Sequence, residues 1–427
     1  MLDEEMMVHY RAADSWPPAW FAFAALVAVG LCAAARAAAT LLAWLHRAYL
    51  RPGRDLARRY GAWAVVTGAT DGIGRAVALG LARRGVHLVL VGRSPEKLSR
   101  VAGEVRAAAP SCEVRTVVFD LAAGGDGPDD EMARGVARVA AAAEGLDVGI
   151  LVNNAGATYP CAAYFHEVEA AAWEAVVRVN VEAATRITRA LLPAMAARGR
   201  GAVVNVGSGS SVVVPAFPLY AVYAASKAIS ADCINAHLVF WQSAKAYEII
   251  DMFRTCAATG LLKFRRSLIL QQKIGKRIFA IDRLKNYAES SPLHHQSYNQ
   301  GAKSQGPEIC VAILPRKYEY IDQFSRSLNV EYKQYGVDIQ CQIPLYVATK
   351  MAPIKGDSPF IPSPEEYAEA ALRCIGYEAR CVPYWRHSVQ WFFASLLPDC
   401  ALNQWRLQIG IRKRNEMKAL LGENGFS

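Results

Sequence analysis

A tyrosine and a lysine four residues apart are the pair in this sequence with the clearest chemical use. Tyr223 and Lys227 stand in the run Tyr-Ala-Ala-Ser-Lys, and residues four apart on a helix share one face. A free phenol has a pKa near 10, and a nearby ammonium group favours the phenolate and lowers that pKa. We therefore expect Lys227 to lower the pKa of Tyr223, and Tyr223 to donate a proton to a ketone oxygen as a hydride reaches its carbon.

The same spacing occurs a second time, in Tyr346-Val-Ala-Thr-Lys350. Tyr223 follows a strand-like segment and a serine-rich loop, and it lies within a helical pattern. Tyr346 instead follows Pro344 after the last strand-like segment, where a loop is expected. The context favours Tyr223 as the proton donor and excludes Tyr346 from that role.

A glycine-rich turn follows the first apolar run, with the sequence Thr67-Gly-Ala-Thr-Asp-Gly-Ile-Gly74. Its glycines let the chain turn sharply and let a pyrophosphate approach the backbone. The helix that follows directs free N–H groups and a positive dipole end at the phosphates. Placed between a strand and a helix, this turn predicts a dinucleotide site, with contacts from Gly68, Thr70, Asp71, Gly72, Ile73 and Gly74.

The residue after the second strand indicates which dinucleotide is bound. An acidic residue there would accept hydrogen bonds from a ribose 2′-hydroxyl, whereas Arg93 offers a guanidinium to a 2′-phosphate. We therefore expect NADPH rather than NADH. Asp120, at the end of the third strand, is placed to accept a hydrogen bond from the adenine amine.

Strand-like and helix-like segments alternate from residue 62 onward. This alternation predicts an α/β fold of the Rossmann type, a doubly wound parallel sheet covered by crossover helices. The predicted strands cover residues 62–67, 87–91, 114–119, 148–152, 202–206 and 337–343, and the predicted helices cover 75–84, 95–109, 132–143, 170–197, 220–228 and 364–376.

An apolar stretch near the N-terminus, residues 18–45, is long enough to span a bilayer if Arg36 is tolerated near one end. We interpret residues 1–50 as a membrane anchor; a buried hairpin, a surface helix or a cleaved signal peptide are the alternatives. Five arginines follow, which places the rest of the chain in the cytosol by the positive-inside rule: Arg47, Arg51, Arg54, Arg58 and Arg59. After Tyr384 the chain is again aromatic and apolar, and we expect an amphipathic element that rests on the membrane or caps a substrate entrance, with a helix packed on the core as the alternative.

The net charge of +10 is unevenly distributed. Residues 229–319 hold 13 Lys and Arg against 7 Asp and Glu, and the remainder holds 35 against 31. No basic stripe interleaved with aromatic residues occurs outside this block, so nucleic-acid binding is not expected. The ten cysteines form no C-x-x-C pair, which argues against a zinc ribbon and a disulfide framework; His294 and His295 also lack ligand spacing, so no metal site is expected.

These motifs, in this order, resemble the short-chain dehydrogenases, and most closely the plant very-long-chain 3-ketoacyl-CoA reductases and related 17β-hydroxysteroid dehydrogenases. The resemblance covers residues 61–228 and 320–421 and includes the stretches TYPCAAYFHEVE and VVNVGSGSSVVVPAFPLYAVYAASKA. It implies an NADPH-dependent enzyme of fatty-acid elongation in the endoplasmic-reticulum membrane, with its catalytic domain in the cytosol. A long-chain 3-ketoacyl-CoA would be the substrate, other elongase subunits the partners, and a homodimer the assembly.

The resemblance also implies roles for further residues. Ser208 matches the serine that hydrogen-bonds the substrate carbonyl, with Ser210 as the alternative by spacing from the tyrosine. Asn180 matches the asparagine that holds a relay water. Lys227 would bind the nicotinamide ribose, and the remaining cofactor contacts would come from Asn153, Ala155, Gly156, Val347 and Thr349. The family commonly has Pro-Gly after the sixth strand, where this chain has Pro344-Leu345.

Residues 229–319 interrupt the helix that begins at Tyr220. Joining Ala228 directly to Tyr320 places Ile321, Phe324 and Leu328 at 7, 10 and 14 positions after Tyr223, which continues one apolar helical face. We interpret the block as a retained intron, a gene-model error or a recent insertion, and a genuine regulatory or membrane-contacting subdomain as the alternative. The predicted organisation is an anchor at 1–50, a nucleotide-binding core at 60–228, this block, and the rest of the core at 320–427.

Two other functions fit the same residues. A hydroxysteroid dehydrogenase would use the same catalytic side chains, and pocket shape rather than sequence would separate it from a ketoacyl-CoA reductase. A catalytically silent membrane protein would follow if the block displaces the packing face of the helix that carries Tyr223 and Lys227.

Overall fold

The structure is a computed structural model that describes residues 19–124, 130–211, 213–227, 320–352 and 358–421. The chain divides into two units, one with residues 1–40 and 235–315, the other with 41–234 and 316–427. In the first unit the described residues belong to an apolar helix, and the second unit holds the sheet and the candidate site. The predicted insertion, residues 229–319, lies outside the described residues.

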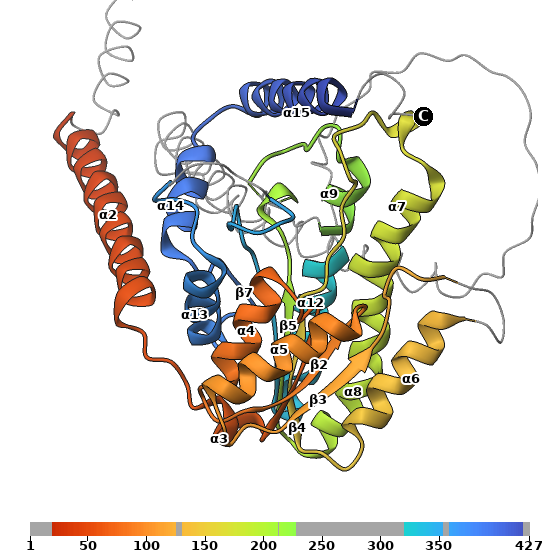
Figure 1. The fold of residues 1–427 in the computed structure, drawn as a ribbon. Coiled ribbons are helices and arrows are strands. Elements are labelled where there is room, and N and C mark those ends of the chain that lie inside the picture. The colour runs from red at the N-terminus through yellow and green to blue at the C-terminus, as the bar shows by residue number, and fades with distance from the viewer. Residues whose placement is uncertain (1–18, 125–129, 212, 228–319, 353–357, 422–427) are drawn as a thin grey trace, which may run out of the picture. The chain divides into compact units, whose positions relative to one another are not determined.

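The second unit is built on a seven-stranded parallel sheet with the order β3-β2-β1-β4-β5-β6-β7, which confirms the doubly wound fold (Figure 1). The order reverses between β1 and β4, and in such sheets ligands bind beside the carboxyl ends of the strands at this point. A seventh strand, which was not predicted, pairs through only two residues. The strands are β1 Trp63–Thr67, β2 His87–Gly92, β3 Val114–Val118, β4 Val148–Asn153, β5 Gly201–Val206, β6 Val337–Gln342 and β7 Arg380–Cys381.

Alternate residues of the central strands face opposite sides of the sheet. On β1, Ala64 and Val66 join the core beneath helices α4, α5 and α13, whereas Trp63 and Val65 join the core beneath α6 and α8. Because both faces are covered, these strands are almost entirely apolar, as expected for a parallel sheet. The covering helices are α4 Gly72–Ala82, α5 Pro95–Ala108, α6 Glu131–Ala143, α8 Ala184–Ala197 and α13 Pro364–Cys374.

The long helix predicted over residues 170–197 is confirmed, but its winding changes in the middle. It comprises α7 Ala170–Val177, a π-helical turn η4 Arg178–Ala183, and α8. A π-turn inserts one extra residue per turn and often occurs at functional sites, and this one carries Asn180. The spacing of apolar residues alone does not reveal such a local widening.

Helix α9, Ala221–Lys227, carries Tyr223, and helix α12, Tyr320–Tyr332, packs beside it against β6. The face predicted for a joined helix is partly confirmed, because Ile321 is buried against Cys341 and Ile343 and Leu328 packs on the core between sheet and helices. Ser325, one turn after Ile321, accepts a hydrogen bond from Asn205 of β5 at 2.9 Å. Residues 320–332 are therefore an integral part of the core.

The apolar helix α2, Ala19–Leu45, continues into a π-helical segment η1, His46–Leu50. Residues Phe23–Leu50 are long and apolar enough to cross a membrane, and their large apolar side chains are exposed. Two of the arginines that follow it belong to the second unit and contact other side chains of that unit. Arg51 pairs with both carboxylate oxygens of Glu378 and lies over the ring of Tyr377, as does Arg54.

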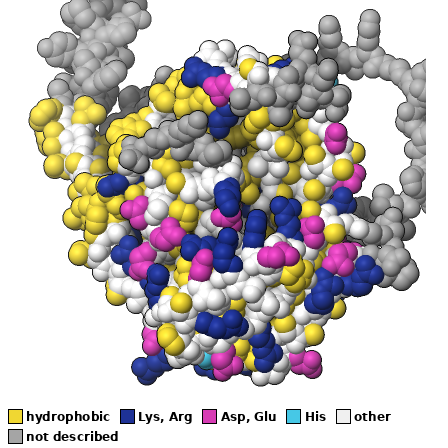
Figure 2. All heavy atoms as spheres, in the orientation of Figure 1, with side chains coloured by type: hydrophobic (Ala, Val, Ile, Leu, Met, Phe, Trp, Pro, Cys, Tyr) yellow, Lys and Arg dark blue, Asp and Glu magenta, His cyan; other side chains and the backbone are white. Residues whose placement is uncertain are grey.

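Two helices follow β7, α14 Trp385–Ala394 and α15 Asp399–Leu421. Both pack on the core, because His387, Leu402 and Arg406 are buried, so the core-packing alternative for the segment after Tyr384 is confirmed. The corner between them nevertheless exposes Phe392, Phe393, Leu396 and Leu397, each by more than half. On the face shown in Figure 2, by contrast, basic and acidic side chains are interspersed over the lower part of the unit.

Candidate active site

The glycine turn between β1 and α4 is shaped to receive a group close to its backbone. Gly68 and Gly72 have positive φ values of 62° and 51°, which side-chain-bearing residues rarely adopt. A Cβ at Gly74 would lie 2.3 Å from the carbonyl oxygen of Gly68. Asp71 caps α4 by accepting a hydrogen bond from Gly72 N at 2.9 Å, and Thr70 and Ile73 are partly buried in the same turn.

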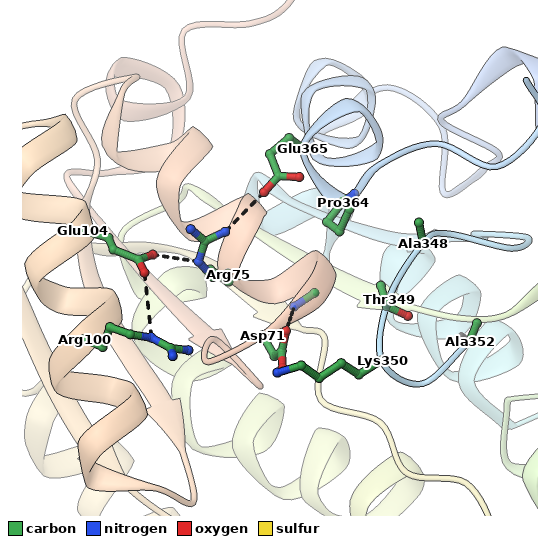
Figure 3. Close-up of a pocket in the computed structure, with 11 residues that line it drawn as sticks. Asp71, Arg75, Arg100, Glu104, Ala348, Thr349, Lys350, Ala352, Pro364 and Glu365 are labelled. Atoms are coloured by element: carbon green, nitrogen blue, oxygen red, sulfur yellow. Dashed lines mark hydrogen bonds and ion pairs between the residues drawn. The ribbon is translucent and has the colours of Figure 1, made fainter. Parts of the chain in front are cut away.

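A cavity of about 630 Å³ opens beside this turn, between α4, α5 and the segment after β6. Figure 3 shows Lys350 reaching across it to Asp71, and their charged atoms are 2.7 Å apart. The hydrogen bond and charge of Lys350 lower the pKa of Asp71. Thr349 is brought against the turn, because a Cβ at Gly72 would lie 3.1 Å from its methyl group, and Val347 is buried against Ile73 and Tyr367.

The two residues predicted to read the adenosine half lie at the ends of β2 and β3. Arg93 is exposed, and no described acidic side chain forms an ion pair with it. Asp120 is half-buried and accepts a hydrogen bond from Ala122 N at 3.1 Å, so one of its oxygens stabilises a turn. The guanidinium of Arg93 is thus available for a phosphate.

The asparagine pair after β4 has two different environments. Asn153 was predicted as a cofactor contact, but its amide is buried in the core, where Nδ2 donates to Thr188 Oγ1 at 2.9 Å and Asn205 Oδ1 at 2.8 Å. It joins β4 to β5 and α8. The next residue, Asn154, donates to the carbonyl oxygens of Thr67 and Gly68 and so holds the glycine turn.

Asn180 joins the π-turn to the helix that carries Tyr223. Its Oδ1 accepts from Ala157 N at 2.8 Å, and its Nδ2 donates to Ala157 O at 3.0 Å and to Ser226 Oγ at 2.8 Å. A substituent at Gly156 would lie 3.5 Å from both Asn180 Oδ1 and Lys227 Nζ. Asn180, Gly156 and Lys227 therefore meet at one place, next to Ala155.

Tyr223 lies at the end of a short chain of hydroxyl groups. Its Oη donates to Ser208 Oγ at 3.3 Å, and Ser208 Oγ is 2.8 Å from Ser210 Oγ. Both serines considered from the sequence therefore lie in the same chain, and Ser208 is the one in direct contact with Tyr223. A carbonyl oxygen that replaced this direct contact would meet the phenol and the Ser208 hydroxyl together.

The expected effect of Lys227 on Tyr223 is not found in this structure. Lys227 is buried, and its Nζ donates to Val206 O at 2.9 Å. Burial raises the pKa of Tyr223, and hydrogen bonding with Ser208 and Ser210 only partly opposes that effect. Burial also lowers the pKa of Lys227 to about 8. Sequence spacing predicted that both residues lie on one short helix, but it did not predict the loss of water around them, which decides the direction of both pKa shifts.

The lowered pKa of Lys227 predicts a dependence of stability on pH. Between about 8 and 10.5 the unfolded chain holds a proton that folded Lys227 has released, so the folded state gains stability as the pH rises through this window. Relative to Lys227→Met, the native chain should become more stable over that range. The unfolding temperatures of the native chain and of Lys227→Met, measured across this pH range, check this prediction. The same dependence of unfolding temperature on pH in both proteins would contradict it.

Several residues of the site carry no motif of their own and were missed. Ser226 accepts from Asn180 and donates to the carbonyl oxygen of Tyr223 at 2.9 Å. Tyr159 accepts from Val222 N at 3.0 Å, at the start of α9. His387 contacts Leu345 N and Tyr346 O of the segment after β6, at 3.3 and 3.1 Å. Burial lowers the pKa of His387 to about 4, so its ring is neutral at physiological pH.

A nicotinamide dinucleotide fits the residues present. The glycine turn leaves room that a Cβ would fill, the helix α4 begins there, and Arg93 stands at the neighbouring strand end. Lys227, Asn180 and Gly156 meet beside the carboxyl end of β4, and Thr349 lies against Gly72. These positions follow the edge of the sheet from the strand-order reversal to Tyr223.

Comparisons with known proteins agree with this geometry. The family model described as "short chain dehydrogenase" matches residues 62–236. A very-long-chain 3-oxoacyl-CoA reductase-like protein of Arabidopsis thaliana is 37% identical over 88% of this chain and 89% of its own length. A very-long-chain 3-oxoacyl-CoA reductase of Anas platyrhynchos is 30% identical over 86% of each chain.

The chain is also similar to two proteins with hydroxysteroid dehydrogenase names. The inactive hydroxysteroid dehydrogenase-like protein 1 of Homo sapiens is 30% identical over 81% of this chain and 75% of its own. A solved structure of a 7β-hydroxysteroid dehydrogenase superposes with a TM-score of 0.54 over 83% of this chain and 99% of that one, at 20% identity, which shows the shared fold.

Proposed function

The chain belongs to the short-chain dehydrogenase family and is an oxidoreductase, and from this premise we propose that it reduces the ketone of a long-chain 3-ketoacyl-CoA with NADPH. The observation that carries the reaction type is the contact between Tyr223 Oη and Ser208 Oγ, 3.3 Å apart, with Lys227 on the same helix. The printed names of relatives at 30% and 37% identity support the substrate class.

In this proposal NADPH supplies a hydride to the ketone carbon. Arg93 would bind its 2′-phosphate, the turn Gly68–Gly74 its pyrophosphate, and Lys227, Gly156, Val347 and Thr349 its nicotinamide half. Asp120 would receive the adenine amine. Asn153 supports this edge of the sheet from within the core rather than by contact.

Side chains of the protein would orient the ketone and supply the proton. Ser208 Oγ donates a hydrogen bond to the ketone oxygen and orients it toward Tyr223, whose phenol donates the proton that completes the alcohol. Stabilisation of the remaining phenolate by the ammonium of Lys227 would require Nζ, which donates to Val206 O in this structure, to act on Tyr223 as well. Asn180 holds α9 through Ser226 and holds the chain at Ala157, so it would position the tyrosine and any water that resupplies its proton.

A hydroxysteroid substrate is the second candidate. The fold shared with a 7β-hydroxysteroid dehydrogenase is compatible with it, but relatives named 3-oxoacyl-CoA reductases match at higher identity over more of the chain. The test is NADPH oxidation by the detergent-solubilised full-length protein, with a long-chain 3-ketoacyl-CoA, a ketosteroid, or neither. We expect turnover with the thioester, and faster turnover with NADPH than with NADH; turnover with the ketosteroid alone would overturn the proposed substrate.

We also propose that α2 anchors the chain in the endoplasmic-reticulum membrane with the sheet in the cytosol. Trp44 and Tyr49 contact Trp385 of α14, with ring centroids 6.4 and 5.6 Å apart. All three rings belong to the second unit, and the exposed corner at Phe392 and Phe393 offers further apolar side chains to a bilayer surface. We expect the full-length protein to stay in the membrane fraction after alkaline extraction. Protease added to intact microsomes should cleave the unit that holds the sheet. Release of the protein by alkali would contradict the anchor. A homodimer and elongase partners remain predictions.

A further inference from the structure

Arg406, on α15, is a buried cation for which the described residues provide no acidic partner. It is 7% exposed. Its Nη1 donates to Tyr346 Oη at 3.0 Å, and its Nε has no hydrogen-bond partner among the described residues. The guanidinium lies 4.0 Å from the centre of the Phe217 ring. A buried charge without a counter-ion destabilises the folded state, so this arrangement indicates a role in binding.

Other strongly buried arginines of the described chain are paired. The side chains of Arg51, Arg380 and Arg414 are each 13% exposed, and they pair respectively with Glu378, Asp322 and Glu167. Arg414 lies two turns after Arg406 on the same helix and so provides a direct comparison. Arg406 differs from it in facing aromatic rings and a phenol instead of a carboxylate.

The surroundings of Arg406 lead directly to the proposed proton donor. The ring of Phe217, over which Arg406 lies, is 6.5 Å from the ring of Tyr223 and 5.7 Å from that of Tyr220. The phenol of Tyr346 is close enough to Tyr223 to raise its pKa further. Arg406, Tyr346 and Phe217 therefore form one group of side chains that adjoins Tyr223.

Helix α15 is held firmly over this segment. Leu219 has a positive φ of 63°, a strained value for leucine, and it is buried beneath α15. A Cβ at Gly410 would lie 2.5 Å from Leu219 Cδ1, so the helix lies almost in backbone contact with the strained turn. Such close packing fixes where Arg406 points.

We propose that Arg406, with the hydroxyl of Tyr346, binds the thioester carbonyl oxygen of a 3-ketoacyl thioester and so positions the neighbouring ketone at Tyr223. The assignment rests on the proposed function and adds to it a means of substrate choice. In a 3-ketoacyl thioester the second carbonyl is two carbons from the ketone. A buried guanidinium is a strong donor to such an oxygen, and an isolated ketone would leave it unsatisfied.

The test compares Arg406→Gln with the native full-length protein on three substrates. They are a long-chain 3-ketoacyl-CoA, the same acyl chain on N-acetylcysteamine, which lacks the CoA phosphates, and a long-chain ketone without a second carbonyl. We expect kcat/KM to fall by about 10- to 100-fold on both thioesters, and to change little on the simple ketone. Arg406→Lys keeps the positive charge but not the planar guanidinium, and it should retain part of the preference for thioesters over the simple ketone.

Arg414→Gln is the matched control, and it should lower stability without changing the ratio of activities between thioester and simple ketone. An equal loss on all three substrates would assign Arg406 a structural role and overturn the proposal. A loss on the CoA thioester alone would show that Arg406 binds the CoA phosphates, which also overturns it. If the native chain reduces neither thioester, the proposed function itself fails, and this outcome is distinct from the other two.

Discussion

Replacing Tyr223 with Phe is expected to lower kcat for ketone reduction by about 10²- to 10⁴-fold, the usual contribution of a positioned general acid. The change removes one oxygen and leaves the ring in place, so the contacts with Phe217 persist and only the 3.3 Å contact with Ser208 is lost. NADPH oxidation with the 3-ketoacyl-CoA, beside a separate measurement of NADPH binding, checks it.

Two controls separate a loss of chemistry from a loss of folding. Thermal unfolding of Tyr223→Phe should match that of the native chain, so that lost activity is not lost fold. Tyr335→Phe, at an exposed tyrosine on the turn before β6, is the matched control and should keep full activity. Turnover retained in Tyr223→Phe would mean that another group supplies the proton.

Deletion of residues 229–319, with Ala228 joined to Tyr320, is expected to raise both stability and activity. Helix α9 has seven residues, and a helix of that length is marginal without tertiary support. Joined to α12, it would continue the face that places Ile321 and Ser325 in the core. Removing the connection also removes a loop-closure cost of about 4 kcal/mol, and we expect the unfolding temperature to rise by several degrees and kcat to increase.

The same deletion carrying Tyr223→Phe is the control, since it should gain the stability but not the activity. Equal activity and equal unfolding temperature in the deleted and full-length forms would contradict the interruption hypothesis. Loss of folding on deletion would instead support a genuine subdomain at 229–319. The first result would leave the assignment of Tyr223 and Lys227 untouched.

The features that could be predicted from sequence depend on neighbours along the chain. The turn at Gly68–Gly74 and the pair Tyr223 and Lys227 are each defined within eight residues, because a glycine turn and a helical face are local geometries. Alternating apolar segments likewise predicted six strands and the doubly wound sheet. The short strand β7 was not predicted, because two residues are too few to show an alternation of apolar and polar side chains.

The features that the sequence did not predict depend on distant parts of the chain and on the exclusion of water. Arg406 and His387 contact the segment at Leu345–Tyr346 from 41 to 60 residues away, and nothing in their own neighbourhood marks them. The five arginines after α2 were interpreted only as a signal of membrane orientation, yet Arg51 and Arg54 also pack on the ring of Tyr377. The π-turn that presents Asn180 likewise lies within an ordinary helical pattern.

The sequence by itself determined the parallel sheet, the phosphate-binding turn and the identity of the proton donor's helix, because each is encoded in spacings shorter than one supersecondary unit. Tertiary structure alone decided which side chains are buried away from water and which charged groups form ion pairs. Burial sets the direction of the pKa shifts of Tyr223 and Lys227, and it leaves Arg406 without an acidic partner among the described residues. These properties arise from the free energy of removing charge from water, which depends on every element packed around the group.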